Sequence, residues 1–306
     1  MGYQLSVRVG SALIVVLGVC TLVFLLLHLV PGDPVDAMLG ESARPADRAA
    51  LRASLGLDQP LLEQYTRYLV GLARLDLGQS FQDQRPVSAV LAERLPATLQ
   101  LAAAALLLAL VLAIPLGVLA AKHRGGPIDG AAMGFSLLGI SLPNFWLGPL
   151  LILVFSLWLG WTPVSGNDGA LSLVLPAITL GTGLAAVLAR MVRASVLEVL
   201  GEDYIRTARA KGLSEAAVLR RHALRNAWLP VLTLVGLQLG GVLGGAVITE
   251  TVFAWPGVGS LLVESIQSRD YPVVQGCVLL ISVLYVLVNA LTDLAYARVD
   301  PRIRLG

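Results

Sequence analysis

Six long stretches of the sequence contain no Asp, Glu, Lys or Arg, and each is 20 to 30 residues long. A helix of about 20 residues, rising roughly 1.5 Å per residue, crosses the roughly 30 Å of hydrocarbon in a bilayer. A charge at the bilayer centre costs about 2.5–3.5 kcal/mol, so charge-free runs of this length are typical of membrane spans. We therefore predict six transmembrane helices, at 9–30, 97–121, 131–160, 170–189, 229–249 and 271–292.

Two of these runs need a closer look. The run 131–160 contains Pro143 and Pro149, and proline kinks a helix. Because 30 residues cannot cross a bilayer twice, we predict one bent or tilted helix there. The run 9–30 follows Arg8 as a signal peptide would, but it is longer than a typical apolar signal region and no A-x-A cleavage site follows it. We predict an uncleaved first helix.

The Lys and Arg residues predict the orientation. With the N-terminus inside, the inner side holds 14 of them and the outer side 8. Seven of those eight lie in the segment 31–95, which is long enough to escape most of the positive-inside rule. We therefore expect a multi-pass protein with both termini in the cytoplasm.

The composition excludes several other classes of protein. The chain has 306 residues, of which 56% are hydrophobic and 14% charged, with a mean hydropathy of +0.78. Soluble domains carry about 25% charged residues. A net charge of +2 gives no reason to expect nucleic acid, and two Cys cannot build a disulfide framework. The prediction is an all-α polytopic membrane protein.

A polar segment at 31–96 interrupts the apolar pattern after the first predicted helix. It carries nine acidic residues and seven Arg, and Leu61, Leu62, Tyr65, Leu69 and Leu72 recur at helical spacing. We expect a few short amphipathic helices over the outer face, either as a passive cover or as a docking surface. The predicted organisation is a first helix at 1–30, this loop at 31–96, and a five-helix core at 97–306.

The second polar segment, at 190–228, is basic and lies on the predicted cytoplasmic side. Residues 203–211 favour a helix, and Gly212 follows where a helix commonly ends in a glycine. Ser214 then suits an N-cap, with Glu215 favourable in the first turn of a second helix that we expect to run to Arg225. The result is a glycine-bent elbow, which suits either a partner's cleft or an anionic lipid surface.

This elbow resembles the signature loop of the inner-membrane permeases of ABC importers. The similar residues are 206–212 (RTARAKG), 222–226 (HALRN) and 229–230 (LP). Many such permeases begin the loop with Glu-Ala-Ala, and Arg206 and Thr207 replace the first two of these residues, as is typical of the dipeptide, oligopeptide and nickel branch. Stretches over nearly the whole chain are similar to that branch too: 29–34 (LVPGDP), 55–60 (LGLDQP), 94–99 (RLPATL), 141–146 (SLPNFW), 253–259 (FAWPGVG), 269–273 (RDYPV) and 300–304 (DPRIR).

The resemblance implies a type I ABC importer permease fold and an assembly in the bacterial inner membrane. The expected partners are a second, non-identical permease, two ATPase subunits that bind ATP and Mg²⁺, and an extracytoplasmic solute-binding protein. The resemblance also implies that the elbow couples this chain to an ATPase. The residues expected to do so are Tyr204, Arg206, Thr207, Ala208, Arg209, Lys211, Gly212, Leu213, Ser214 and Glu215.

The sequence offers no catalytic site. A P-loop needs Gly-Lys-Ser/Thr, and the two Lys, Lys122 and Lys211, are followed by His and Gly. The three His form no metal motif. We expect no bound cofactor and no enzymatic activity in this chain.

Polar residues within spans are costly and tend to face a cavity. Five of them are candidates for the translocation path, although each also suits a helix–helix hydrogen bond: Ser141, Asn144, Thr179, Gln238 and Asn289. Glu250 and Asp293, at span ends, are expected to face water. Gly236, Gly240 and Gly244 form a small-residue stripe that suits close helix packing, either within the chain or against a second permease.

The predicted function is translocation of di- and oligopeptides, driven by separate ATPases. The cargo alternatives are a nickel chelate, an opine or glutathione. A stand-alone, gradient-driven carrier is the alternative from another class; it predicts an intramembrane charge or an inverted repeat, and neither is evident.

Overall fold

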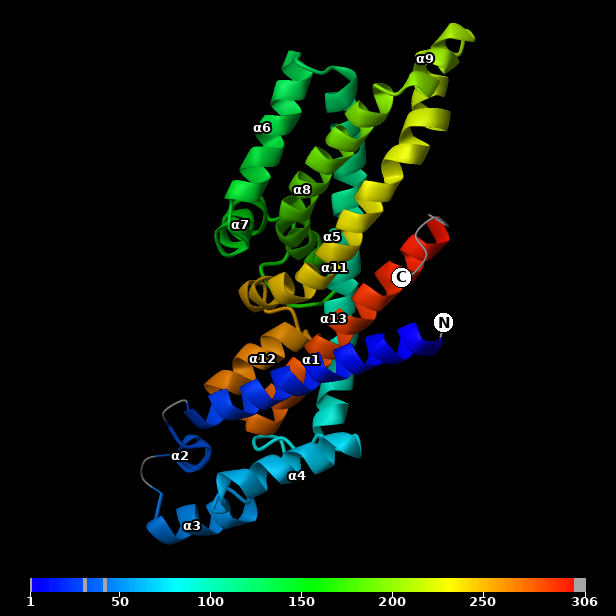
Figure 1. Ribbon diagram of the computed structural model, residues 1–306. Coiled ribbons are helices and arrows are strands. Elements are labelled where there is room, and N and C mark those ends of the chain that lie inside the picture. The colour runs from blue at the N-terminus through cyan, green and yellow to red at the C-terminus, as the bar shows by residue number, and fades with distance from the viewer. Residues whose placement is uncertain (1, 30–31, 41–42, 300–306) are drawn as a thin grey trace. The chain divides into compact units, whose positions relative to one another are not determined.

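The computed structural model describes residues 2–29, 32–40 and 43–299, and these residues are almost entirely helical (Figure 1). An isolated bridge between Gln79 and Pro86 is the only strand-like pairing in this part of the chain. The helices are α1 (Gly2–Leu29), α2 (Pro34–Leu39), α3 (Pro45–Ser54), α4 (Leu61–Ala73), α5 (Val87–Lys122), α6 (Pro127–Ser141), α7 (Asn144–Leu151), η1 (Ile152–Trp158), η2 (Ala170–Leu173), α8 (Val174–Leu200), α9 (Asp203–Ala210), α10 (Glu215–Ala217), η3 (Val218–Ala223), α11 (Leu224–Val252), α12 (Val258–Gln267) and α13 (Tyr271–Val299).

The chain divides into two compact units. Unit 1 comprises Met1–Thr98 and Pro256–Val286, and unit 2 comprises Leu99–Trp255 and Leu287–Gly306. Helices α5 and α13 contribute to both. The predicted three-part division of the chain remains a prediction.

Unit 1 contains the predicted outer segment, and its short helices begin where the sequence favours a start. Pro34 and Pro45 open α2 and α3 in the first turn, where a missing N–H costs nothing. The Asp33 carboxylate caps α2 by accepting from the Val35 N–H at 2.9 Å. The helix expected from the spacing of Leu61 to Leu72 is α4. The core of unit 1 joins the start of α5 to α12 and α13 through Val87, Val90, Leu91, Val258, Leu261, Val273 and Cys277.

Unit 2 is a bundle in which α8 packs against both α6 and α11 (Figure 1). Its core is rich in alanine: Ala109, Ala113, Ala121, Ala185, Leu188, Ala189, Val192, Val196, Ala227 and Val231 are all buried. Small side chains allow close helix approach, as is common in membrane bundles. A Cβ at Gly117 would lie 2.6 Å from the carbonyl oxygen of Ala189, so α5 and α8 meet backbone to backbone there.

The predicted bent helix at 131–160 is divided more sharply than we expected. Helix α6 ends at Ser141, and the helical pair Asn144–Trp158 leaves it at 102°. Leu142 is extended, with φ −89° and ψ 113°, because the residue before a proline is driven out of the helical region. Pro143 therefore ends α6 instead of merely bending it.

Three helices are long and apolar enough to cross a membrane among the described residues: Val87–Lys122, Ala170–Leu200 and Tyr271–Thr292. The broken pair just described and a second pair, Glu215–Val242 with Gly244–Val252, raise this number to five if each is one span. A shorter apolar helix, Leu13–Leu29, matches the first predicted span. The fold is therefore all-α with several apolar helices, and the count of six spans remains a prediction.

Candidate functional site

The predicted elbow forms as helix α9, a glycine turn and helix α10, and we call residues 203–225 the basic arm. Gly212 has φ +81°, a conformation that favours glycine. The Gly212 N–H donates to the Arg209 carbonyl at 2.9 Å, and the Leu213 N–H donates to the Ala208 carbonyl at 3.4 Å. These two bonds are the pair that defines a Schellman motif, which ends a helix at a left-handed residue.

The second helix of the arm starts where the sequence indicated. Ser214 is extended, and its hydroxyl oxygen accepts from the Ala217 N–H at 3.4 Å. The predicted end of this helix at Arg225 is wrong. The chain passes through the π-helical turn η3 and continues without interruption into α11, which also contains Pro230.

A small apolar core holds the two helices of the arm together. Ile205, Ala208 and Val218 are buried, and Leu213 packs against them. Across the turn, Arg209 makes a two-pronged ion pair with Glu215, with Nε to Oε1 at 2.8 Å and Nη2 to Oε2 at 3.3 Å. This carboxylate raises the pKa of the Arg209 guanidinium above its ordinary value. The glycine bend is thus fixed by the backbone, by apolar packing and by charge.

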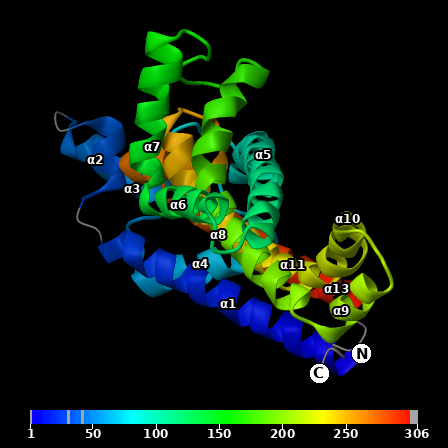
Figure 2. The same cartoon turned by 90° about the horizontal axis from the view of Figure 1, so that it is seen from above.

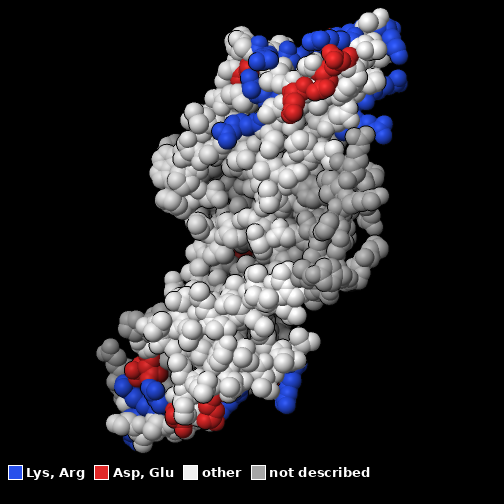
Figure 3. Space-filling view, in the orientation of Figure 1, with Lys and Arg blue, Asp and Glu red and all other residues white. Residues whose placement is uncertain are grey.

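The ten residues expected to contact an ATPase differ in exposure. Tyr204, Arg206, Thr207, Arg209, Lys211, Gly212, Ser214 and Glu215 are exposed, and Leu213 is half-buried. Ala208 is buried inside the arm, so its side chain serves the arm's own packing. Figure 3 shows Lys and Arg gathered at the end of unit 2 that carries α9, whereas the neighbouring surface of this unit is almost free of charge.

A cavity of about 360 Å³ lies where the arm joins the bundle. Its lining includes Glu198 near the end of α8, Glu202 at the N-cap of α9, and Tyr204 and Asn226. The Asn226 amide donates to the Tyr204 hydroxyl at 2.7 Å, which ties the start of α9 to the start of α11. Figure 2 shows α9 and α10 side by side at this end of the unit. The surface here therefore combines acidic residues in the cavity with basic residues on the exposed helix α9. Such a surface suits a protein partner with complementary charges.

The family model described as binding-protein-dependent transport system inner membrane component matches residues 113–305, which include the whole arm. The model for the N-terminal part of such membrane components matches residues 1–102. The chain belongs to this family.

Relatives of this transport component include the dipeptide transport system permease protein DppB of Escherichia coli (strain K12), which is 45% identical over 97% of each chain. The glutathione transport system permease protein GsiC of Pectobacterium atrosepticum is 46% identical over 94% of each chain. Among solved structures, the MetNI methionine ABC transporter in an inward-facing conformation covers 70% of this chain and 97% of its own, with 22% identity and a TM-score of 0.60. That structural likeness shows the fold of an ABC importer permease.

The five path candidates of this transport component are spread over unit 2. Thr179 is buried and its hydroxyl donates to the Leu175 carbonyl at 2.8 Å, so its polar group is satisfied within α8. Ser141 is exposed, and Asn144 and Asn289 are half-buried. Gln238 differs, because its buried Oε1 has no hydrogen-bond partner in the described part of the chain. The translocation path remains a prediction, and Gln238 is the candidate that has a buried polar atom left to pair.

The structure buries the acidic residues Asp129 and Glu250, and sequence reasoning predicted neither. Arg193 of α8 donates from Nε and Nη2 to the two carboxylate oxygens of Asp129 at 2.6 and 2.7 Å, and Asp129 also accepts from the Gly125 N–H at 2.9 Å. The two partners are 64 positions apart, so no local pattern shows the pair. Glu250, expected to face water, is fully buried. That expectation was wrong because a position at the end of a span can still lie inside the protein. The side chain of Asp293 lies outside the described residues.

Proposed function

We propose that this chain is a membrane-spanning permease subunit of an ABC importer that carries di- and oligopeptides across the bacterial inner membrane. The observation that carries the proposal is the basic arm, which is built into a rigid bend and exposes charged residues between two apolar helices, α8 and α11. A family match over the same residues and a dipeptide permease at 45% identity support it.

The proposed mechanism transmits work from partner subunits through the arm. Two ATPase subunits bind ATP and Mg²⁺ and seat the arm in a cleft, so that their closure moves the helices joined to it. Because α9 follows α8 and α10 leads into α11, a displacement of the arm acts on two helices that pack against each other. A ligand biases a two-state motion only through contacts that differ between the states, and the arm supplies that contact. A second, non-identical permease and a solute-binding protein complete the assembly.

The chain itself is proposed to hydrolyse no ATP and to bind no cofactor. Neither Lys122 nor Lys211 stands in a P-loop pattern. No group of three or more His, Cys, Asp or Glu that could hold a metal ion occurs among the described residues. A gradient-driven carrier would transport without ATPase subunits, so reconstitution of the purified chain alone distinguishes the two classes. We expect no uptake in that experiment.

The coupling role is tested with charge reversals in the assembled importer. We expect Arg206→Glu with Arg209→Glu to reduce ATP-dependent dipeptide uptake about tenfold or more, the effect of losing an interface anchor. Membrane insertion should be unchanged. Arg44→Glu with Arg74→Glu makes the same charge change in unit 1 and should leave uptake intact. Normal uptake by the arm variant would contradict the proposal.

A second variant separates docking from folding of the arm. Exchanging the charges as Arg209→Glu with Glu215→Arg keeps an ion pair across the glycine turn but presents reversed charges to a partner. We expect this exchange to impair uptake as Arg209→Glu alone does. Restored uptake would show that the pair serves only the internal structure of the arm.

Glutathione is the second candidate cargo, because a glutathione permease is 46% identical to this chain. Competition for uptake between a labelled dipeptide and unlabelled glutathione separates the two. We expect dipeptides to compete well and glutathione to compete poorly. The reverse order would assign the chain to glutathione.

A further inference from the structure

Unit 1 contains a cavity of about 660 Å³ that the coupling mechanism does not use. Its walls come from the end of α1, the turn between α3 and α4, helix α4, the loop at 76–84 and the start of α13. Small-molecule sites typically measure about 300–1,000 Å³, so this cavity has the size of one.

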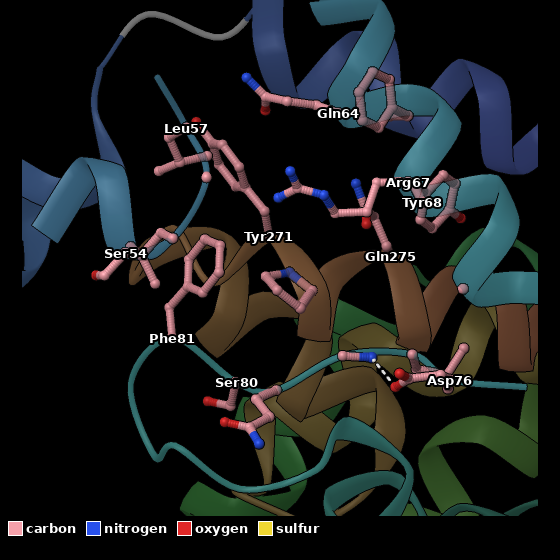
Figure 4. Close-up of a pocket in the computed structure, with 18 of the residues that line it drawn as sticks. Ser54, Leu57, Gln64, Arg67, Tyr68, Asp76, Ser80, Phe81, Tyr271 and Gln275 are labelled. Atoms are coloured by element: carbon pink, nitrogen blue, oxygen red, sulfur yellow. Dashed lines mark hydrogen bonds between the residues drawn. The ribbon is translucent and has the colours of Figure 1, made fainter. Parts of the chain in front are cut away.

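Arg67 places a positive charge in this cavity. Figure 4 shows its side chain reaching from α4 into the space beside Tyr271 and Gln275. The guanidinium donates to the Gln59 side chain. It lies over Gly56, where φ is +67° and an added Cβ would overlap it. The exposed side chain of Arg67 thus contacts the turn before α4 at Gln59 and Gly56.

The charge of Arg67 is not balanced by the described protein. No Asp or Glu lies within ion-pair distance of it among the described residues, whereas Arg48, Arg52 and Arg85 of the same unit pair with Asp36, Asp33 and Glu93. A positioned guanidinium is well suited to bind a carboxylate in a two-pronged geometry. Arg67 is therefore available to an anionic group that enters the cavity.

Asp76 adds a negative charge to another part of the lining. Its Oδ1 accepts from the Gly78 N–H at 2.9 Å, which fixes the carboxylate, and its Oδ2 has no hydrogen-bond partner in the described part of the chain (Figure 4). Aromatic rings form a further part of the cavity lining. The ring centroids of Phe81 and Tyr271 are 6.3 Å apart, and those of His28 and Tyr271 are 5.8 Å apart.

We propose that this cavity binds a short peptide by its free termini. The peptide carboxylate pairs with Arg67, the terminal ammonium pairs with Asp76, and a side chain lies against Phe81 and Tyr271. A simple anion would use Arg67 alone, whereas a cation, a carboxylate and aromatic surface together match a zwitterion with an apolar body. The choice of a peptide as the zwitterion rests on the proposed function. The outer segment then holds cargo instead of serving only as a cover.

The test compares ligand and protein changes on the full chain in lipid nanodiscs, without partner subunits. The probes are L-alanyl-L-phenylalanine, its C-terminal amide and its N-acetyl derivative, titrated by calorimetry. We expect saturable binding of the free dipeptide and about tenfold or more weaker binding of the amide, as for loss of a hydrogen bond to a charged group. Arg67→Gln should weaken binding of the free dipeptide by the same factor and leave the affinity for the amide unchanged.

Asp76→Asn should weaken binding of the free dipeptide about tenfold or more and leave the affinity for the N-acetyl derivative unchanged. Arg74→Gln is the matched control, because Arg74 caps the same helix but does not line the cavity. Binding by Arg74→Gln should equal that of the unmodified chain. If Arg67→Gln fails to fold, the comparison of free dipeptide with amide on the unmodified chain still decides the question.

Three results would overturn the proposal. The first is the absence of saturable dipeptide binding, and the second is equal affinity for the free dipeptide and its amide. The third is that Arg67→Gln reduces the affinity for the dipeptide and for the amide by the same factor. If the dipeptide does not bind but Arg67→Gln abolishes capture of the solute-binding protein, the cavity receives a protein segment instead. Dipeptide uptake by the assembled importer is measured in parallel, so the cavity proposal can fail while the proposed function stands.

Discussion

Asp129 and Arg193 show how a single residue pair can hold two helices of the bundle. Asp129 retains 8% of its side-chain exposure and Arg193 retains 27%, so the carboxylate is the more deeply buried partner. The Gly125 N–H provides a third hydrogen bond to that carboxylate. Removing one member of such a pair leaves the other charge without compensation, whereas removing both does not.

We therefore expect Arg193→Gln to lower the melting temperature of the purified chain by several degrees, because it leaves the Asp129 carboxylate unpaired. Asp129→Asn should cost less, since Arg193 is more exposed and an amide oxygen still accepts from Gly125. The double variant should have a higher melting temperature than Arg193→Gln. Melting can be followed with a thiol-reactive dye, because the thiols of Cys20 and Cys277 are buried in the folded chain and react on unfolding. If Arg193→Gln and the double variant have the same melting temperature, the ion pair does not stabilise the bundle in the way described.

At the scale of helices, the glycines of α11 lie in two different environments. A Cβ on Gly236 would overlap the side chain of Thr292 on α13, so this glycine permits close packing within the chain. Gly241 and Gly244 have open space where a Cβ would stand, and Leu237 and Ile248 nearby are exposed. The stripe seen in the sequence therefore serves intrachain packing at one end, and its other end has open space that suits contact with the second permease proposed above.

We expect Gly236→Ala to destabilise the chain by about 1–3 kcal/mol, the usual cost of overpacking. Adding Thr292→Ala should recover much of this loss, because it removes the overlapping atoms. Gly244→Leu is the control: the isolated chain should melt normally, and only its co-purification with the second permease should decrease. Unfolding melts and affinity capture from the assembled importer check these expectations. If Gly236→Ala melts as the unmodified chain does, α11 and α13 do not approach so closely.

Local signals in the sequence predicted where helices and turns form better than they predicted which residues contact one another. Gly212 and Ser214 predicted the bend of the basic arm because a left-handed turn and an N-cap each depend on one residue type. Pro143 signalled a kink and also accounts for the extended Leu142, but the 102° break depends on how the following helix packs. The buried Asp270 accepts from Ser80, 190 positions earlier, and such pairing appears only when the chain is folded. The Arg67 cavity was missed for the same reason.

At the scale of the whole molecule, the number of spans decides on which side of the membrane each segment lies. The described helices give up to five spans, and α1 raises the number to six if it also crosses. With six spans both termini share one side, and with five they do not. The distribution of Lys and Arg favours six spans, with the basic arm in the cytoplasm and the segment at 31–96 outside.

Single cysteines in exposed helices test this topology directly. Ala53 on α3 and Ala216 on α10 are both exposed alanines, so Ala53→Cys and Ala216→Cys form a matched pair. We expect a membrane-impermeant maleimide to label Ala53→Cys in intact spheroplasts and Ala216→Cys only in inside-out vesicles. The unmodified chain should stay unlabelled in both, because Cys20 and Cys277 are buried. Labelling of Ala216→Cys from outside would place the basic arm beyond the reach of cytoplasmic ATPases, and the coupling mechanism could not operate.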